Sequence, residues 1–168
     1  MKYLIFSDLH GSLLGLERLK ACIHEEKPDV VICLGDILYG AYDGNATKCV
    51  AYLSNLEMPL LGVKGNCDVS NEEAVLRVHL PSQHIFFFHN HRIIIAHAPF
   101  YYAFQLNDIA MFGHTHVKQL YKENGVYYLN PGSIGKPRDG VASYAILSEE
   151  GLFLKSAETF ELLKHEYI

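Results

Sequence analysis

The sequence predicts a mixed α/β fold, a four-layer α-β-β-α sandwich in which two mixed sheets stack between helices. Six short apolar runs, rich in isoleucine, valine and aromatic residues, each end in a polar cluster, as strands do when both of their faces are buried. Helical patterns separate the first three runs, which indicates right-handed βαβ units and a parallel sheet. Short polar turns join the apolar runs of the second half, which indicates antiparallel hairpins.

The predicted buried strands share one pattern, four or five apolar residues followed at once by polar side chains. In chain order they cover residues 3–6, 30–34, 60–63, 93–96, 109–112 and 126–129. Ligands of open α/β sheets bind outside the carboxyl ends of the strands. The polar clusters therefore mark the place where a site is expected.

Three helices are expected between or after the first strands, at residues 13–23, 45–56 and 71–78. In the first of them, Leu13, Leu16 and Leu19 recur at near-helical spacing. Ser12 is a candidate N-cap of this helix, and Pro28 lies beyond its end, where proline commonly follows a helix.

Three antiparallel hairpins are expected in the second half of the chain. They pair residues 86–88 with 92–94, residues 117–121 with 126–129, and residues 143–147 with 152–155. Asn124-Gly125 in the second hairpin is a strong turn signal. No repeat, linker or low-complexity stretch interrupts the chain, so a single domain is expected over residues 1–168.

Composition and charge narrow the function classes. Hydrophobic residues make up 49% of the chain and charged residues 20%, which is typical of a globular protein. No apolar run is long enough to cross a bilayer and the first is too short for a signal peptide, so a cytoplasmic protein without membrane contact is expected. A net charge of -5 without clustered Lys or Arg argues against an extended nucleic-acid surface. The four cysteines form no CxxC pair and are predicted to be free thiols.

The polar clusters at the strand ends contain a set of side chains that bind metals. The set has two carboxylates, four imidazoles and one amide: Asp8, His10, Asp36, Asn66, His97, His114 and His116. Mixed oxygen and nitrogen donors without a necessary thiolate suit Mn²⁺, Fe or Zn²⁺ in a catalytic site better than a closed structural zinc. The alternative is that these are loop residues that cap helices or turns, with Asn66 a turn residue and His97 structural.

Seven ligands exceed what one open catalytic metal takes, but they suffice for two ions when one carboxylate bridges them. Asp36 is the natural bridge. Asp8 and His10 are two residues apart, as are His114 and His116, so in extended segments each pair can point the same way. Two ions roughly 3.5–4 Å apart clamp a phosphoryl group and lower the pKa of a bridging water toward neutrality.

The ordered motifs D-x-H, G-D, G-N-C-D, a histidine after a strand, and G-H-T-H resemble the calcineurin-like metallophosphoesterase superfamily. The resemblance extends from Asp8 to the N-P-G-S segment at residues 130–133. The G-N-C-D form and the N-P-G-S tail resemble its small prokaryotic branch, the YfcE-type phosphodiesterases. The resemblance implies one metal held by Asp8, His10, Asp36 and His116, and a second held by Asp36, Asn66, His97 and His114.

By this resemblance, the chain is expected to be a binuclear metal-dependent phosphodiesterase or phosphatase that hydrolyses a small phosphoester by in-line attack of a metal-bridging hydroxide. Asp36, Asn66 and His97 are predicted to be catalytic as well as ligands. Manganese is the expected ion, with iron, zinc or nickel as alternatives. The alternative function is a non-catalytic metal-binding interaction scaffold, as the retromer subunit of this superfamily illustrates. The aromatic hairpin at residues 86–88 offers an interface for a homo-oligomer without requiring one.

Two positions depart from the wider superfamily pattern. Cys67 stands where many relatives have the histidine that protonates the leaving group, and a thiol with a pKa near 8.5 suits that role poorly. Ala98 stands where relatives often carry a second histidine after His97. Asp68 is expected to support the site, either by hydrogen bonds to its own loop or by orienting a ligand imidazole. Lys136 and Arg138 follow the N-P-G-S segment and could contact a phosphate, but exposed turn residues are often basic, and the second interpretation is preferred.

Overall fold

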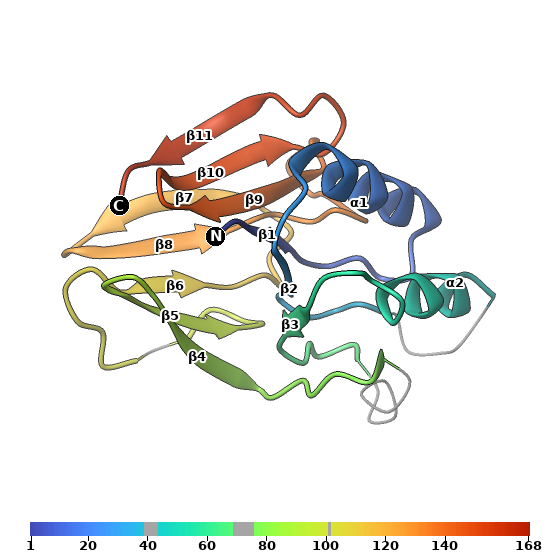
Figure 1. Ribbon diagram of the computed structural model, residues 1–168, viewed down its shortest axis with the longest axis horizontal. Coiled ribbons are helices and arrows are strands. Elements are labelled where there is room, and N and C mark those ends of the chain that lie inside the picture. Colours follow the sequence, from blue (N-terminus) through green and yellow to red (C-terminus); the bar gives the residue numbers. More distant parts are fainter. Residues whose placement is uncertain (39–43, 69–75, 101) are drawn as a thin grey trace.

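The computed structural model describes residues 1–38, 44–68, 76–100 and 102–168 (Figure 1). Within these residues two sheets, of six and five strands, contain both parallel and antiparallel pairs. The predicted mixed α/β class with two mixed sheets is therefore confirmed.

The six-stranded sheet has the strand order β11-β10-β9-β1-β2-β3. The first three strands in the chain form its parallel part, and they are β1 (Tyr3–Phe6), β2 (Val30–Cys33) and β3 (Leu60–Gly62). The last three are antiparallel to their neighbours, and they are β9 (Ser143–Ser148), β10 (Gly151–Ser156) and β11 (Leu162–Glu166). β1 lies at the junction, where Ile5 pairs with Ile32 on one side and with Ala145 on the other.

Both described helices, α1 (Leu13–Glu26) and α2 (Gly44–Leu53), pack on the same face of the six-stranded sheet. α1 begins as predicted, because the Ser12 hydroxyl accepts a hydrogen bond from the amide of Gly15 at 3.1 Å. It ends at Lys27, whose left-handed backbone closes the last turn. Neither helix is long and apolar enough to cross a membrane. The third predicted helix, at residues 71–78, lies largely outside the described residues.

The five-stranded sheet has the order β4-β5-β6-β8-β7. Its strands are β4 (Gln83–Phe88), β5 (His91–Ala96), β6 (Ile109–Met111), β7 (Gln119–Glu123) and β8 (Val126–Asn130). The hairpins β4–β5 and β7–β8 are antiparallel as predicted. The second half is not purely a set of antiparallel hairpins, because β6 pairs in parallel with both β5 and β8.

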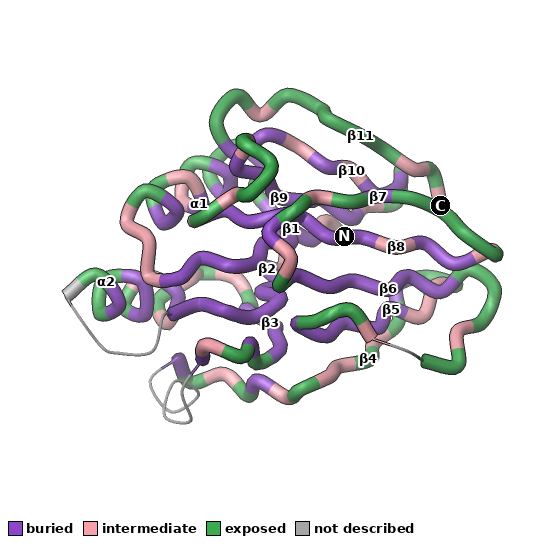
Figure 2. Tube along the Cα trace, turned by 180° about the vertical axis from the view of Figure 1, so that it is seen from behind, coloured by how far each residue is buried: buried purple, intermediate pink, exposed green. Residues whose placement is uncertain are grey.

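Two further features differ from the predictions. β7 begins and ends two residues later than expected, because Asn124 and Gly125 form a two-residue turn with φ of 50° and 80° that pairs Glu123 with Val126. β11 was not expected, and its mostly exposed residues pair with β10 at the edge of the six-stranded sheet (Figure 2).

A loop takes the place of helices on the outer face of the five-stranded sheet, at least in the described part of the chain. The Arg92 guanidinium lies over the Tyr102 ring and donates to the carbonyl of Ala103. Phe104 packs edge-on against Tyr128, which projects from β8. In the described residues, helices therefore form one of the two outer helical layers of the expected four-layer arrangement.

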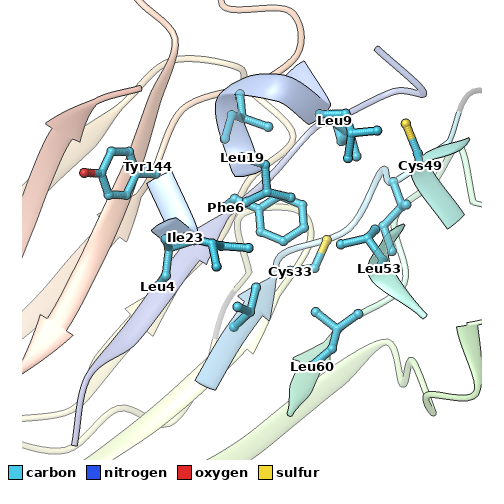
Figure 3. Close-up of a cluster of buried hydrophobic side chains, with 14 of the residues drawn as sticks. Leu4, Phe6, Leu9, Leu19, Ile23, Cys33, Cys49, Leu53, Leu60 and Tyr144 are labelled. Atoms are coloured by element: carbon cyan, nitrogen blue, oxygen red, sulfur yellow. The ribbon is translucent and has the colours of Figure 1, made fainter. Parts of the chain in front are cut away.

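The residues of β1 explain why its sequence is continuously apolar. Leu4 and Phe6 belong to the hydrophobic cluster under α1 and α2 (Figure 3), whereas Tyr3 and Ile5 belong to the cluster between the two sheets. Successive side chains of a strand point to opposite faces, so every residue of β1 is buried (Figure 2). Full burial of one large apolar side chain contributes about 1.5–3 kcal/mol, and this double-sided core holds the ends of the parallel strands in place.

Candidate metal centre

The loops that follow five strands converge between the two sheets. They begin after β1, β2, β3, β5 and β6, and they carry all seven predicted ligands, Asp8, His10, Asp36, Asn66, His97, His114 and His116. Because β1, β2 and β3 run parallel to one another, as do β5, β6 and β8, the carboxyl ends of each set lie at the same edge of their sheet.

The first ligand group consists of Asp8, His10 and His116. The Nε2 atoms of His10 and His116 are 3.1 Å apart, and His116 Nε2 lies 3.3 Å from Asp8 Oδ1. His10 Nε2 is also 3.6 Å from Asp36 Oδ2. All of these side chains are buried, so their polar atoms face each other rather than water.

The second ligand group consists of Asn66, His97 and His114. Asn66 Oδ1 lies 3.0 Å from His97 Nε2 and 2.9 Å from His114 Nδ1, and the two ring nitrogens are 3.3 Å apart. His97 Nε2 is 3.4 Å from Asp36 Oδ2. The same Asp36 oxygen therefore borders both groups.

The donor set fits divalent cations. Asp8 Oδ1 is buried and accepts no hydrogen bond from the described residues, which is costly for a carboxylate oxygen unless a cation meets it. Ligand atoms of Asp8, His10 and His116 lie within 4.8 Å of one another, as do those of Asp8, Asp36 and His97. Imidazole nitrogens and carboxylate oxygens at this spacing are typical of Mn, Fe or Zn sites.

The outer ring nitrogens of two histidines are held by backbone carbonyls. His97 Nδ1 donates to the carbonyl of Leu34, and His116 Nδ1 donates to the carbonyl of Lys136, both at 2.7 Å. Because a carbonyl only accepts, Nδ1 must carry a proton, and in the neutral ring the Nε2 lone pair faces the site. Metal-binding histidines are commonly oriented in this way.

Five of the seven residues have a left-handed backbone. The φ angles are 55° at Asp8, 50° at His10, 53° at Asp36, 65° at His114 and 60° at His116. The expected extended conformation at the two D-x-H and H-x-H pairs is therefore wrong, and tight turns aim these side chains inward. Such conformations cost about 1–3 kcal/mol each and concentrate at functional sites.

Glycines beside the ligands allow the loops to approach closely. A Cβ on Gly65 would lie 2.1 Å from Asp36 Oδ1, and one on Gly113 would lie 1.9 Å from the hydroxyl oxygen of Ser7. No side chain fits at such distances, so the G-N-C-D and G-H-T-H motifs require glycine at these positions.

Asp68 clamps the loop that carries Asp36 to its own loop. Its carboxylate accepts hydrogen bonds from the amides of Asp36, Ile37 and Gly65 at 2.8–2.9 Å, and from that of Leu38 at 3.2 Å. The side chain is buried. Of the two predicted supporting roles, the hydrogen bonds to the loop are the one observed.

The segment at residues 130–133 holds the ligand loops in place by hydrogen bonds, a role that was not predicted from the sequence. The side-chain amide of Asn130 donates to the carbonyl of Gly113 and to the hydroxyl of Thr115, at 2.8 and 3.0 Å. The Ser133 hydroxyl donates to the carbonyl of Asp8 at 2.7 Å. Its position after β8 was the available signal.

Electrostatic interactions couple Asp36 to His97. Burial alone raises the pKa of Asp36, but hydrogen bonds with His97 and with the Cys67 amide lower it to about 2. Burial alone lowers the pKa of His97, but the contact with Asp36 raises it. In the metal-free chain, the contact therefore favours the charged form of each of the two groups. Burial and the carboxylates of Asp36 and Asp68 raise the pKa of Cys67 to about 11, and all four cysteines are free as predicted.

Two adjoining hollows open on the ligands. The first, of about 400 Å³, is lined by His10, Asp36, Asn66, Cys67, His114, His116, Lys136 and Arg138. The second, of about 560 Å³, includes Ala98, Pro99 and Phe100. Asn66 and His114 border both hollows, so the second ligand group lies where the two meet.

Residues 1–151 match the family model described as the calcineurin-like phosphoesterase superfamily domain. The chain belongs to this superfamily. Phosphodiesterase YfcE of Escherichia coli K12 is 30% identical over an alignment of 168 positions that covers 90% of each chain. Both findings support a phosphoesterase, and the family implies a divalent metal.

Solved structures share the fold. The structure of Yfce, a phosphoesterase from E. coli, covers 100% of both chains with a TM-score of 0.89 at 24% identity. Wild-type Vps29 from Entamoeba histolytica, complexed with Zn²⁺, covers 100% of this chain and 98% of its own with a TM-score of 0.67 at 19% identity. Enzymes and a vacuolar sorting protein thus have the same architecture.

Proposed function

We propose that this phosphoesterase is a binuclear metal-dependent phosphodiesterase that hydrolyses a small phosphoester. Asp8, His10, Asp36 and His116 would hold one divalent ion, and Asp36, Asn66, His97 and His114 would hold the other. The observation that carries the proposal is the place of Asp36 Oδ2, which lies within 3.6 Å of His10 Nε2 and 3.4 Å of His97 Nε2.

When bound, two divalent ions, with manganese as the first choice, would polarise the phosphoryl group and lower the pKa of a water molecule toward neutrality. The chain's own contribution is to hold the donors rigidly. Asp36 is ionised at neutral pH because its pKa is about 2. Leu34 and Lys136 orient the His97 and His116 rings through their carbonyls.

A diester is favoured over a monoester for two reasons. The two hollows that meet at Asn66 and His114 provide one space for each substituent of a phosphodiester. Cys67, with a pKa of about 11, is poorly matched to protonating a leaving group at neutral pH. Substrates with stable leaving groups, such as aryl esters, need less of this help. The similarity to the E. coli phosphodiesterase agrees with this choice.

An activity screen tests the proposal. The purified chain is stripped with a chelator and reloaded with Mn²⁺, Fe²⁺, Zn²⁺ or Ni²⁺, then given bis-(p-nitrophenyl) phosphate and p-nitrophenyl phosphate. We expect turnover only after reloading, and higher kcat/KM for the diester. Folded, metal-loaded protein that is inert toward a panel of diesters and monoesters would refute the proposal.

The alternative is a non-catalytic metal-binding scaffold on the same fold, and Vps29 with bound zinc makes it worth separating from the enzyme. A scaffold would bind ions without turnover in the same screen. The convergence of all seven donors favours the enzyme, because a scaffold has no need of a shared carboxylate between two ligand groups.

A further inference from the structure

A basic turn borders the candidate metal centre. Lys136 and Arg138 line the first hollow together with His10, Cys67 and His114. Both residues are exposed and lie in bends, as the preferred interpretation of the sequence expected. Their location beside the ligands favours the other interpretation as well, a contact with phosphate.

The turn is fixed to a ligand through its backbone. His116 Nδ1 donates to the carbonyl of Lys136 at 2.7 Å, and the Arg138 amide donates to the carbonyl of His116 at 3.1 Å. The Lys136 amide donates to the hydroxyl of Ser133 at 2.7 Å. The base of each basic side chain is therefore held at a constant position relative to the ligands.

The Arg138 guanidinium borders the hollow, and the acid next to it in the sequence is already paired with another residue. The adjacent acid, Asp139, is engaged by Lys118, whose Nζ and backbone amide lie 2.8 and 2.9 Å from Asp139 Oδ2. Across the described residues, no carboxylate pairs with the Arg138 guanidinium. A guanidinium stays protonated at every physiological pH and presents several donors that match a phosphate.

The second hollow has a different character. Ala98, Pro99 and Phe100 line it beside Lys64, so it presents an apolar surface next to His97. The two sides of the metal centre thus differ in charge and polarity. A phosphodiester with two different substituents matches this difference better than a symmetric one.

We propose that Lys136 and Arg138 form an anion-binding subsite that receives a second phosphate, carried on one of the two substituents of the phosphodiester. The inference rests on the proposed function, since the first phosphoryl group is taken to lie at the metal ligands. The other substituent occupies the apolar hollow beside Phe100.

The test compares two diesters with the same leaving group, p-nitrophenyl ethyl phosphate and p-nitrophenyl 2-phosphoethyl phosphate. The wild-type chain should prefer the second. Arg138→Ala should raise KM for the second about tenfold, the effect of losing a charge-assisted hydrogen bond, and should thereby reduce the preference for the second diester over the first by a similar factor. Arg138→Lys should recover part of the loss, and the remote control Lys164→Ala should change neither.

Equal effects of Arg138→Ala on both substrates, or no wild-type preference, would overturn the subsite. If neither diester is hydrolysed, the proposed function fails, and calorimetry still tests the subsite. In the Mn²⁺-loaded chain, Arg138→Ala should then weaken binding of inorganic pyrophosphate about tenfold without changing that of orthophosphate. An unchanged affinity for pyrophosphate would refute it.

Discussion

The two ligand groups of the candidate metal centre differ in burial. Asp8, His10 and His116 of the first group are 0%, 8% and 8% exposed. In the second group only His97 is buried, whereas Asn66 and His114 are exposed. The first group is thus the more buried one and borders only the first hollow, through His10 and His116, whereas the second group borders both hollows.

This difference indicates a division of labour. The first group is held by the hydrogen bond of His116 to Lys136 and by the Ser133 hydroxyl on the Asp8 carbonyl. An ion there would be better shielded from water and would exchange more slowly. An ion at the second group would exchange faster and contact the substrate.

The largest effect is expected for Asp36→Asn, because this residue borders both groups. Neutralising a shared carboxylate should weaken both ions and lower kcat/KM for bis-(p-nitrophenyl) phosphate by about a thousandfold or more. The measurement is steady-state kinetics with saturating Mn²⁺, with circular dichroism to show that the variant is folded. A variant that keeps more than about a tenth of the activity would show that Asp36 is not shared.

The two groups themselves are compared by His114→Ala and His116→Ala. We expect His114→Ala to keep one slowly exchanging ion and to lose about a hundredfold in activity, since only the exposed half is damaged. His116→Ala should lose the slowly exchanging ion. Manganese titration and chelator-chase kinetics measure both, with His24→Ala on α1 as a histidine control. Identical exchange behaviour in the two variants would remove the asymmetry.

A smaller effect is expected for Asp68→Asn, because Asp68 reaches the shared Asp36 and the loop of Asn66 only through backbone amides. An amide oxygen cannot accept all four of the hydrogen bonds that the carboxylate receives, so unfolding should be easier by about 1–3 kcal/mol. Metal affinity should fall about tenfold, since the loops are less well held. Chemical denaturation of the chelated chain and manganese titration check the two parts. An unchanged affinity would make Asp68 purely structural.

The smallest effect is a pH dependence of the metal-free chain. The pKa of Asp36 is about 2 in the folded state against about 3.9 when unfolded. A lowered pKa contributes stability that is complete above the unfolded value and is lost as pH falls through the folded value, here about 2.6 kcal/mol in all. The chelated wild type should lose most of this amount relative to Asp36→Asn between about pH 5 and pH 2. If the free energies of unfolding of the two proteins change in parallel with pH, the lowered pKa of Asp36 is contradicted.

The buried strands and the ligand residues were predictable because each is local. Four apolar residues followed by Ser7 and Asp8 indicate a strand end without any knowledge of the partners. The parallel pairing of β6 with β5 and β8 was not predictable, because it depends on contacts between segments far apart in the sequence. β11 was missed because exposed residues such as Leu162 and Leu163 give no burial pattern.

Within the site, residue identity was predictable and conformation was not. The spacing of His114 and His116 suggested an extended pair, yet both have a positive φ. Tertiary hydrogen bonds such as those of Asn130 to the Gly113 loop impose these turns. The arrangement of Lys136 beside the ligands likewise follows from the turn after Ser133, which no periodicity in the sequence indicates.

Electron paramagnetic resonance of the chain loaded with two equivalents of Mn²⁺ tests the central claim most directly. Two ions that share Asp36 would be roughly 3.5–4 Å apart, and their spins would couple. We expect uptake of two ions per chain and a spin-coupled signal that Asp36→Asn abolishes. Uptake of a single ion, or a signal of isolated Mn²⁺ at every loading, would contradict it.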